Sequence, residues 1–312
     1  MSHETDQQAE FTIFAHVFYP DVWEEMRREI ADAIHQPFGL VVTRPSSVAA
    51  VPLPDTRFLV FSRQIELENR GRDILPFLRA LRQPDLPLTD IGLKLHTKRS
   101  PHRSDGADWR RFLSHSLLET DGQGKLLGHA VIAQEKRIAL IAPRAHLLPL
   151  DGRTSINDGI ISDLLTSLYG GDRTGDAKLT RFAAGSMFWF RRSLLTPLLS
   201  DDIATRFAPE YGQLDGTAAH ALERMFSTIV ERQGYLSAAM ENAVPVLEAP
   251  SSSLSAAQLA DLIDRTLDHE NPFSLSLRDF WRKNPRLLRV AHMIYARMPK
   301  RLIRVLRAAV QR

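Results

Sequence analysis

The segment "LKLHTKRSPH" (residues 93–102) has the pattern of a buried strand that ends in a cationic loop. Two leucines alternate there with Lys94 and His96, and this period of two is typical of a strand. The loop then adds further basic or imidazole side chains and no carboxylate: Lys98, Arg99 and His102. So much positive charge at the tip of a strand predicts a site for an anion.

Strands and helices alternate around this segment up to about residue 145. Short runs of β-branched and aromatic residues predict strands at 11–20, 38–45, 57–66 and 138–143, and a strand with its loop in "IGLKLHTKRS" (91–100). Helical spacing of apolar residues predicts helices after Pro20, over 73–83 and over 108–119. This order predicts an α/β fold with a mostly parallel sheet covered by helices on both faces. The second half is more helical, with helices expected over 156–171 and from Thr217 to Gly234, and a strand followed by a helix over 182–200.

Composition bounds the organisation of the chain. The 312 residues contain no cysteine, which excludes disulfides and thiolate chemistry. The start has no signal-peptide pattern and no run is long enough for a transmembrane helix, so we expect a cytoplasmic protein. We expect a disordered start (1–10), one domain large enough to be catalytic (11–248), and a Ser-rich linker with a basic amphipathic helical tail (249–312).

Two compact motifs fall at the carboxyl ends of neighbouring predicted strands, where ligands of parallel sheets collect. One is the cationic segment above, and the other is "ENRGRD" (68–73), in which Arg70 and Arg72 flank Gly71. Arginine forks and lysines suit the oxygens of a diphosphate. Each basic residue taken alone is better explained as a solvated surface charge, whereas two such motifs at one edge favour an anion site. Asp73 is suited either to bind a sugar hydroxyl or to cap the helix that it precedes. His96 and His102 have no carboxylate spaced to complete a metal site.

The second half offers a candidate acceptor site. In "AAGSMFWFRR" (183–192) Gly185 permits close backbone approach, Ser186 is polar, and Trp189 is the best candidate to stack on a sugar. A buried strand explains the neighbouring phenylalanines equally well. Asp215, in "GQLDGT" (212–217), precedes a helix and is suited to cap it. His220, Glu223 and Arg224 then share one helix face, which is interpreted either as a solvated face or as support for Asp215.

Taken together, these motifs resemble the rhamnan synthesis F family of bacterial polysaccharide proteins. The resemblance covers about residues 11–245 and includes "HVFYPDVWEEM" (16–26), "WRRFL" (109–113) and the four motifs quoted above. It implies a glycosyltransferase-A-like domain, a nucleotide-diphosphate sugar of the dTDP-rhamnose type as donor, and a glycan or lipid-linked acceptor. It also implies that a carboxylate near Asp215 removes the acceptor proton, as an inverting displacement requires. That fold usually places an Asp-x-Asp motif at the strand end occupied here by Lys94 and His96, so we expect metal-independent donor binding and no cofactor.

The resulting hypothesis is an inverting glycosyltransferase with Asp215 as its catalytic base. We expect the donor diphosphate to be bound by Arg70, Arg72, Lys94, His96, Lys98 and Arg99. We expect the donor or its sugar to contact Asn69, Gly71, Asp73 and His102. We expect the acceptor to contact Gly185, Ser186, Trp189 and His220. The alternative is a non-catalytic module of the same fold that binds glycans or phosphorylated lipid.

The tail from 276 to 312 mixes aliphatic residues with many arginines and one carboxylate, Asp279. Such a segment is suited to lie on an anionic membrane surface, which would make the protein peripheral on the inner face of the cell membrane. Packing on the domain with its arginines in water is an equally good interpretation. Nucleic acid is not an expected partner, because the other motifs suit sugar-nucleotide chemistry.

Overall fold

The computed structural model describes residues 8–97, 99, 105–154, 156–171, 180–209, 215–249 and 254–268, together with 286, 287, 289, 290, 293 and 294. Most of the predicted disordered start and of the basic tail lie outside these residues. None of the helices in the described ranges is long and apolar enough to cross a bilayer.

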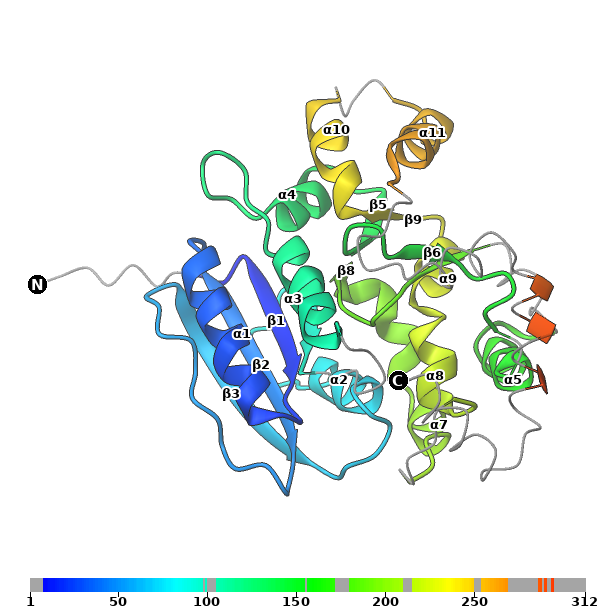
Figure 1. The fold of residues 1–312 in the computed structure, drawn as a ribbon, viewed down its shortest axis with the longest axis horizontal. Coiled ribbons are helices and arrows are strands. Elements are labelled where there is room, and N and C mark those ends of the chain that lie inside the picture. Colours follow the sequence, from blue (N-terminus) through cyan, green and yellow to red (C-terminus); the bar gives the residue numbers. More distant parts are fainter. Residues whose placement is uncertain are drawn as a thin grey trace, which may run out of the picture.

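A seven-stranded sheet forms the centre of the molecule, with the strand order β3–β2–β1–β4–β8–β5–β9 (Figure 1). Its strands are β1 (Phe11–His16), β2 (Phe38–Pro45), β3 (Leu59–Leu67), β4 (Ile91–His96), β5 (Ile138–Ala142), β8 (Phe188–Arg191) and β9 (Leu236–Ala239). The pairs β1–β2, β1–β4, β2–β3 and β5–β9 are parallel, whereas β8 is antiparallel to β4 and β5. This mostly parallel sheet confirms the predicted fold class and agrees with a glycosyltransferase-A-like arrangement. Outside it, β6 (Leu147–Pro149) and β7 (Arg181–Ala183) form a small antiparallel pair.

Helices cover both faces of the sheet. In the first half they are α1 (Pro20–Ala33), α2 (Ile74–Leu81), α3 (Gly106–Leu117) and α4 (Leu127–Gln134), and α5 (Asp158–Tyr169) begins the second half. The connection through α1 leads from β1 to β2, whereas the one through α2 returns from β3 to β4 in the opposite direction. Because such crossovers are right-handed, α1 and α2 pack on opposite faces. Residues at both faces of β1 are consequently buried, as the uninterrupted apolar pattern predicts.

The second half is more broken than its sequence suggests. After α5, the helical elements described up to residue 268 are η1 (Arg192–Leu199), α7 (Asp201–Thr205), α8 (Ala218–Glu223), α9 (Phe226–Glu231), η2 (Met240–Asn242), α10 (Ala243–Glu248) and α11 (Ala256–Thr266). The single helix expected from Thr217 to Gly234 is therefore two helices. They meet at a tight turn, in which the Arg224 and Met225 amides donate to carbonyls three residues back, at 3.1 and 2.9 Å.

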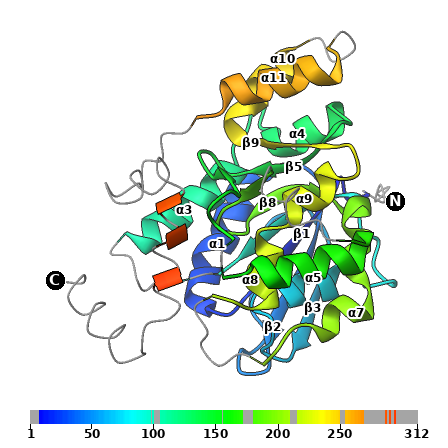
Figure 2. The ribbon, with the colours of Figure 1, turned by 90° about the vertical axis from the view of Figure 1, so that its right-hand side faces the viewer.

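The helix after the Ser-rich stretch packs onto the domain rather than extending from it. Figure 2 shows α11 beside α10 at the β9 end of the sheet. Leu259 and Ile263 of α11 join the hydrophobic core, and Asn242 Nδ2 donates to the Ile263 carbonyl at 3.0 Å. A domain boundary at 248–249 remains a prediction.

The carboxyl ends of β1, β2, β3 and β4 lie at one edge of the sheet, because these strands are parallel. The loops that leave this edge contain both motifs that the sequence singles out. Since β8 is antiparallel, its first residue rather than its last reaches the same edge, where Phe188 pairs with Lys94. The turn before β8 is thereby brought next to the end of β4.

Candidate functional site

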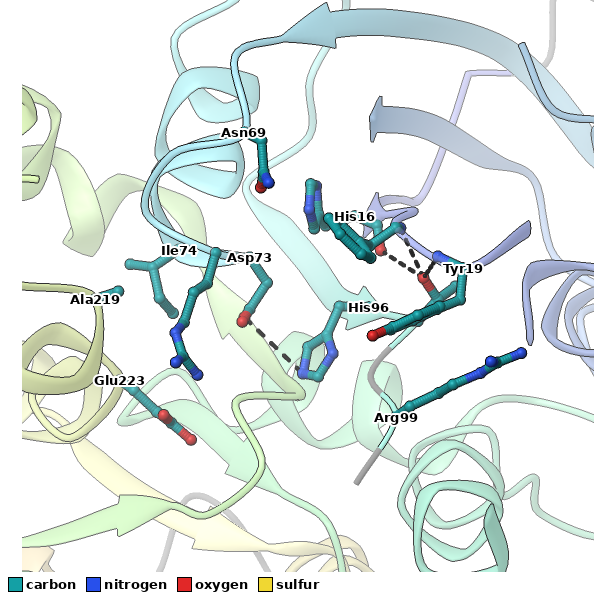
Figure 3. Close-up of a pocket in the computed structure, with 12 residues that line it drawn as sticks. His16, Tyr19, Asn69, Asp73, Ile74, His96, Arg99, Ala219 and Glu223 are labelled. Carbon is teal, nitrogen blue, oxygen red and sulfur yellow. Dashed lines mark hydrogen bonds and ion pairs between the residues drawn. The ribbon is translucent and has the colours of Figure 1, made fainter. Parts of the chain in front are cut away.

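A cavity of about 420 Å³ opens at this edge of the sheet. Its walls come from the ends of β1 and β4, from the loop between β3 and α2, and from α8 (Figure 3). Five of the residues that the sequence predicts for donor binding line it: Asn69, Arg72, Asp73, His96 and Arg99. The structure thus brings the two predicted motifs into one site. Lys98 and His102 lie outside the described residues.

The two arginines of "ENRGRD" diverge. Gly71 and Arg72 both have left-handed backbone, with φ of 70° and 54°. A Cβ on Gly71 would lie 2.5 Å from Leu75 Cβ, so this turn requires glycine. Arg72 lines the cavity, whereas Arg70 is directed away from it and donates from Nε to the Phe207 carbonyl at 2.5 Å. The prediction that Arg70 binds the diphosphate is therefore wrong for this structure, and Gly71 contributes by shaping the turn.

Lys94 does not face the cavity. Its side chain is only 1% exposed, and Nζ donates to Asp73 Oδ2 at 2.5 Å, to the Ser186 carbonyl at 2.7 Å and to Ser186 Oγ at 2.9 Å. A fully buried ammonium requires such partners, because desolvation disfavours an isolated charge. The prediction that Lys94 pairs directly with a diphosphate is corrected: the anion at the tip of β4 is the protein's own Asp73.

His96 lies two residues after Lys94 on the same face of β4 and contacts the same turn before β8, formed by Gly185 and Ser186. Its Nε2 lies 2.7 Å from the Gly185 carbonyl and 3.9 Å from Asp73 Oδ2. Gly185 and Ser186 both have left-handed backbone, with φ of 93° and 57°. The side chains of Lys94 and His96 therefore both hydrogen-bond to the turn before β8. Ser186 is buried and neither turn residue lines the cavity, so their predicted contact with an acceptor is not seen.

Trp189 belongs to the core rather than to a sugar site. It is 0% exposed, its Nε1 donates to the Leu117 carbonyl at 2.8 Å, and its ring packs against Gly128. The predicted stacking of Trp189 on a sugar is therefore wrong. The physical reason is that β8 lies inside the sheet with both faces covered, so the aromatic run is buried on either side.

Asp215 is held by its own neighbours. Its carboxylate accepts from Asn157 Nδ2 at 2.9 Å, the Gly216 amide at 3.0 Å and Arg224 at 3.2 Å. Burial by itself would raise the pKa of Asp215, but the Arg224 guanidinium and the Asn157 amide hold it below its usual value. The carboxylate is thus ionised at neutral pH.

Helix α8, which follows Asp215, places Glu223 rather than His220 at the cavity. His220 is buried, and its Nδ1 lies 2.7 Å from Thr217 Oγ1. Burial and the nearby Arg72 lower the pKa of His220 to about 4, so it is neutral at pH 7. Neither Asp215 nor His220 lines the cavity, whereas Ala219 and Glu223 do.

Several residues of the cavity were missed by the sequence reasoning. His16 is the last residue of β1, Phe18 and Tyr19 follow β1, and Thr97 follows β4. The "VFYP" run was interpreted as the end of the first strand, although β1 ends at His16. Pro20 begins α1, in agreement with the sequence prediction, but it follows the two aromatic residues and so does not indicate that the strand has already ended at His16.

The imidazole of His16, in the wall of the cavity, is neutral at pH 7. Burial lowers the pKa of His16 to about 4, against the opposing attraction of Asp73. Within the described ranges, no three His, Asp or Glu side chains gather as a metal site would require. Metal independence itself remains a prediction.

Replacing Lys94 tests the internal ion pair. We expect Lys94→Met to lower the free energy of unfolding by about 3–5 kcal/mol, since it leaves the partner charge of a buried pair uncompensated. Chemical denaturation measures this, and the double variant with Asp73→Ala should lose less than the sum of the single variants. The exposed Lys136→Met is the control and should change stability by less than about 0.5 kcal/mol. A Lys94→Met protein as stable as the control would contradict the assigned role.

Comparison with known proteins adds a family to this geometry. The family described as "Rhamnan synthesis protein F" matches residues 1–235. Relatives named "Uncharacterized protein WxcX" from two strains of Xanthomonas campestris pv. campestris are each 34% identical over 242 residues. The alignments cover 77% of this chain and 34% of each relative, so the chain spans about a third of their length. The family match covers well over half of the chain, and the chain therefore belongs to the rhamnan synthesis protein F family, whose name connects it with polysaccharide synthesis.

Proposed function

We propose that this chain is an inverting glycosyltransferase that moves a sugar from a nucleotide-diphosphate donor, such as a dTDP-rhamnose-type sugar, to a glycan or lipid-linked acceptor. One observation carries the proposal: Arg72, Arg99, Asp73 and Glu223 line a single cavity at the carboxyl edge of a mostly parallel sheet. Cations for a leaving diphosphate and carboxylates for hydroxyl groups are the two kinds of group that glycosyl transfer needs. Family membership supports the same class of chemistry.

Arg72 and Arg99 are the proposed partners of the diphosphate. Both line the cavity and come from different loops, Arg72 from the turn before α2 and Arg99 from the segment after β4. Guanidinium groups stay charged at all working pH values and bind phosphate oxygens in a fork. They would neutralise the leaving group directly, which is the basis for proposing metal-independent binding.

Asp73 is the proposed acceptor of hydrogen bonds from the donor sugar. Its carboxylate bonds through Oδ2 to the buried Lys94 and also borders the cavity, where Figure 3 shows it directed towards His96. The adjacent ammonium favours the ionised form of Asp73, and an ionised carboxylate is a strong acceptor for sugar hydroxyls. Lys94 thus supports the donor site without contacting the donor.

Transfer then needs a base for the acceptor hydroxyl. The acceptor oxygen bonds to the anomeric carbon while its proton passes to a carboxylate. The bond from that carbon to the diphosphate oxygen breaks, and its electron pair leaves on the diphosphate. Two carboxylates compete for the role. Asp215 is the base that the sequence predicts, and it is bonded to Asn157. Glu223 is supported by its place on the cavity wall, and no hydrogen bond or ion pair among the described residues involves its carboxylate.

The affinity for the donor nucleotide should distinguish Arg72 from Arg70, which lie in the same loop. We expect Arg72→Gln to weaken binding of dTDP by about tenfold or more, because it removes a charge-assisted contact. Arg70→Gln is the matched control and should change the Kd by less than about threefold, since Arg70 is turned away from the cavity. Isothermal titration measures both, with and without a chelator of divalent ions. Binding that disappears in chelator would refute the metal-independent part of the proposal.

A paired substitution assigns the base. We expect Glu223→Gln to lower the transfer rate by about 10²–10⁴-fold while donor binding is retained, because only the proton acceptor is lost. We expect Asp215→Asn to act mainly on stability through its bonds to Asn157 and Arg224. Turnover with a nucleotide sugar and thermal melting distinguish the two. The reverse pattern would assign the base to Asp215.

The tail is proposed to bring the domain to the membrane that holds a lipid-linked acceptor. The described tail residues are helical, and four of them are exposed apolar side chains at helical spacing: Leu287, Val290, Met293 and Ile294. Arg286 and Arg289 lie among them, and Arg289 also donates from Nη2 to Asp151 Oδ1 of the domain at 2.9 Å. An exposed apolar stripe with cations beside it matches an anionic lipid surface.

Vesicle flotation tests the tail. We expect the full chain to float with vesicles containing phosphatidylserine and to remain below with neutral ones, because each nearby cation contributes about 1 kcal/mol on an anionic surface. The double variant Leu287→Ser/Ile294→Ser should lose most of this binding, whereas Val244→Ser, at an exposed apolar position of the domain, should not. Equal flotation of all three proteins would count against membrane docking.

A further inference from the structure

An aromatic pair at the cavity carries an inference beyond the proposed reaction. Phe18 is 38% exposed, and among residues 8–268 that the structure describes, Val244 is the other large hydrophobic side chain exposed to this degree. Phe18 and Tyr19 both line the cavity. Their rings meet edge to face, with centroids 5.0 Å apart and an interplanar angle of 70°. We call these two residues the aromatic platform.

The aromatic platform is held in place by its backbone. Both amides donate to a single oxygen, Thr97 Oγ1, at 2.8 Å from Phe18 and 2.9 Å from Tyr19. The Thr97 amide in turn donates to the His16 carbonyl at 3.0 Å. The end of β4 thus fixes the chain that leaves β1. A preorganised aromatic surface loses little entropy when a flat ligand stacks on it.

Arg99 joins the aromatic platform to the cationic part of the cavity. Its guanidinium carbon lies 4.7 Å from the centroid of the Tyr19 ring, and its side chain also pairs with Asp21. The cation–π contact holds this arginine beside the aromatic rings. Figure 3 shows Tyr19 and Arg99 together at one side of the cavity, with Ala219 and Glu223 at the other and Asp73 between them.

We propose that the aromatic platform is the nucleobase subsite, on which the base of the donor nucleotide stacks; this rests on the proposed donor class. The polarity of the cavity supports the orientation. The donor sugar needs a hydrogen-bond acceptor such as Asp73, and the proposed base Glu223 has to lie beyond that sugar; both side chains lie away from Tyr19. A flat base needs aromatic faces, and every base has one. The diphosphate then lies between, within reach of Arg99.

The neutral His16 fits this orientation as well. It lines the cavity, its Nδ1 lies 3.0 Å from Thr43 Oγ1, and a neutral imidazole offers a hydrogen bond without adding charge. The cavity volume of about 420 Å³ is within the range of small-molecule and cofactor sites, roughly 300–1,000 Å³.

Two ligands separate stacking from charge. The probes are inorganic pyrophosphate and whichever of dTDP, UDP and GDP the wild-type chain binds most tightly. We expect Phe18→Leu to raise the Kd of the nucleotide by about tenfold, within the range found when a stacked aromatic is removed, and to leave that of pyrophosphate unchanged. Phe18→Trp should restore nucleotide binding, because it restores an aromatic face. Val244→Ala is the control for an exposed apolar residue of the domain and should bind both ligands normally.

The outcomes distinguish this inference from the proposal beneath it. Nucleotide binding that is unchanged in Phe18→Leu, or lost in parallel with pyrophosphate binding, overturns the aromatic platform as a base subsite while leaving a donor site in place. A wild-type chain that binds none of the nucleotides overturns the donor class and the subsite together. Isothermal titration of the full chain gives all of these values.

Discussion

The hydrogen-bonded ion pair between Lys94 and Asp73 is the interaction on which the site depends. An ammonium without solvent must be compensated inside the protein, and three oxygens do so here, two of them from Ser186. These oxygens come from the start of α2 and from the turn before β8, which are 113 residues apart in the chain (186 − 73). One side chain on a central strand therefore fixes the relative positions of two loops, and the cavity keeps its shape because their positions are linked.

This arrangement changes what the basic strand end means. The resemblance to the glycosyltransferase-A fold implies acidic residues at this position, which would attract a cation and through it a diphosphate. Here the cation is covalently part of the strand, and its counter-charge is a carboxylate on a neighbouring loop. Arg72 and Arg99 lie further out, at the wall of the cavity, where Arg99 also pairs with Asp21. The inner ion pair thus joins two loops, whereas the outer arginines border the cavity.

The periodicity of the sequence predicted the sheet, its mostly parallel direction and the meeting of two motifs at one edge, since these follow from local patterns and the right-handed crossover rule. It did not predict the direction of individual side chains. Arg70 and Arg72 are two residues apart, yet the left-handed turn at Gly71 separates them, and their types give no sign of this. Trp189 was assigned to a sugar because its burial depends on β4 and β5 as neighbours, which are distant in sequence. Phe18 and Tyr19 were hidden because the apolar run of β1 continues into them.

The reversed direction of β8 has a further effect on how such a protein can diversify. Because β8 lies between two strands that run the other way, the chain between β5 and β8 must leave the sheet and return at the cavity edge. That excursion contains α5 and the small β6–β7 pair, which lie outside the seven-stranded sheet although their apolar side chains join the hydrophobic core. None of its described residues lines the cavity, but its last turn is bonded to Lys94 and His96 at the end of β4. A change in the length or packing of this segment would therefore reach the cavity through the side chains of β4.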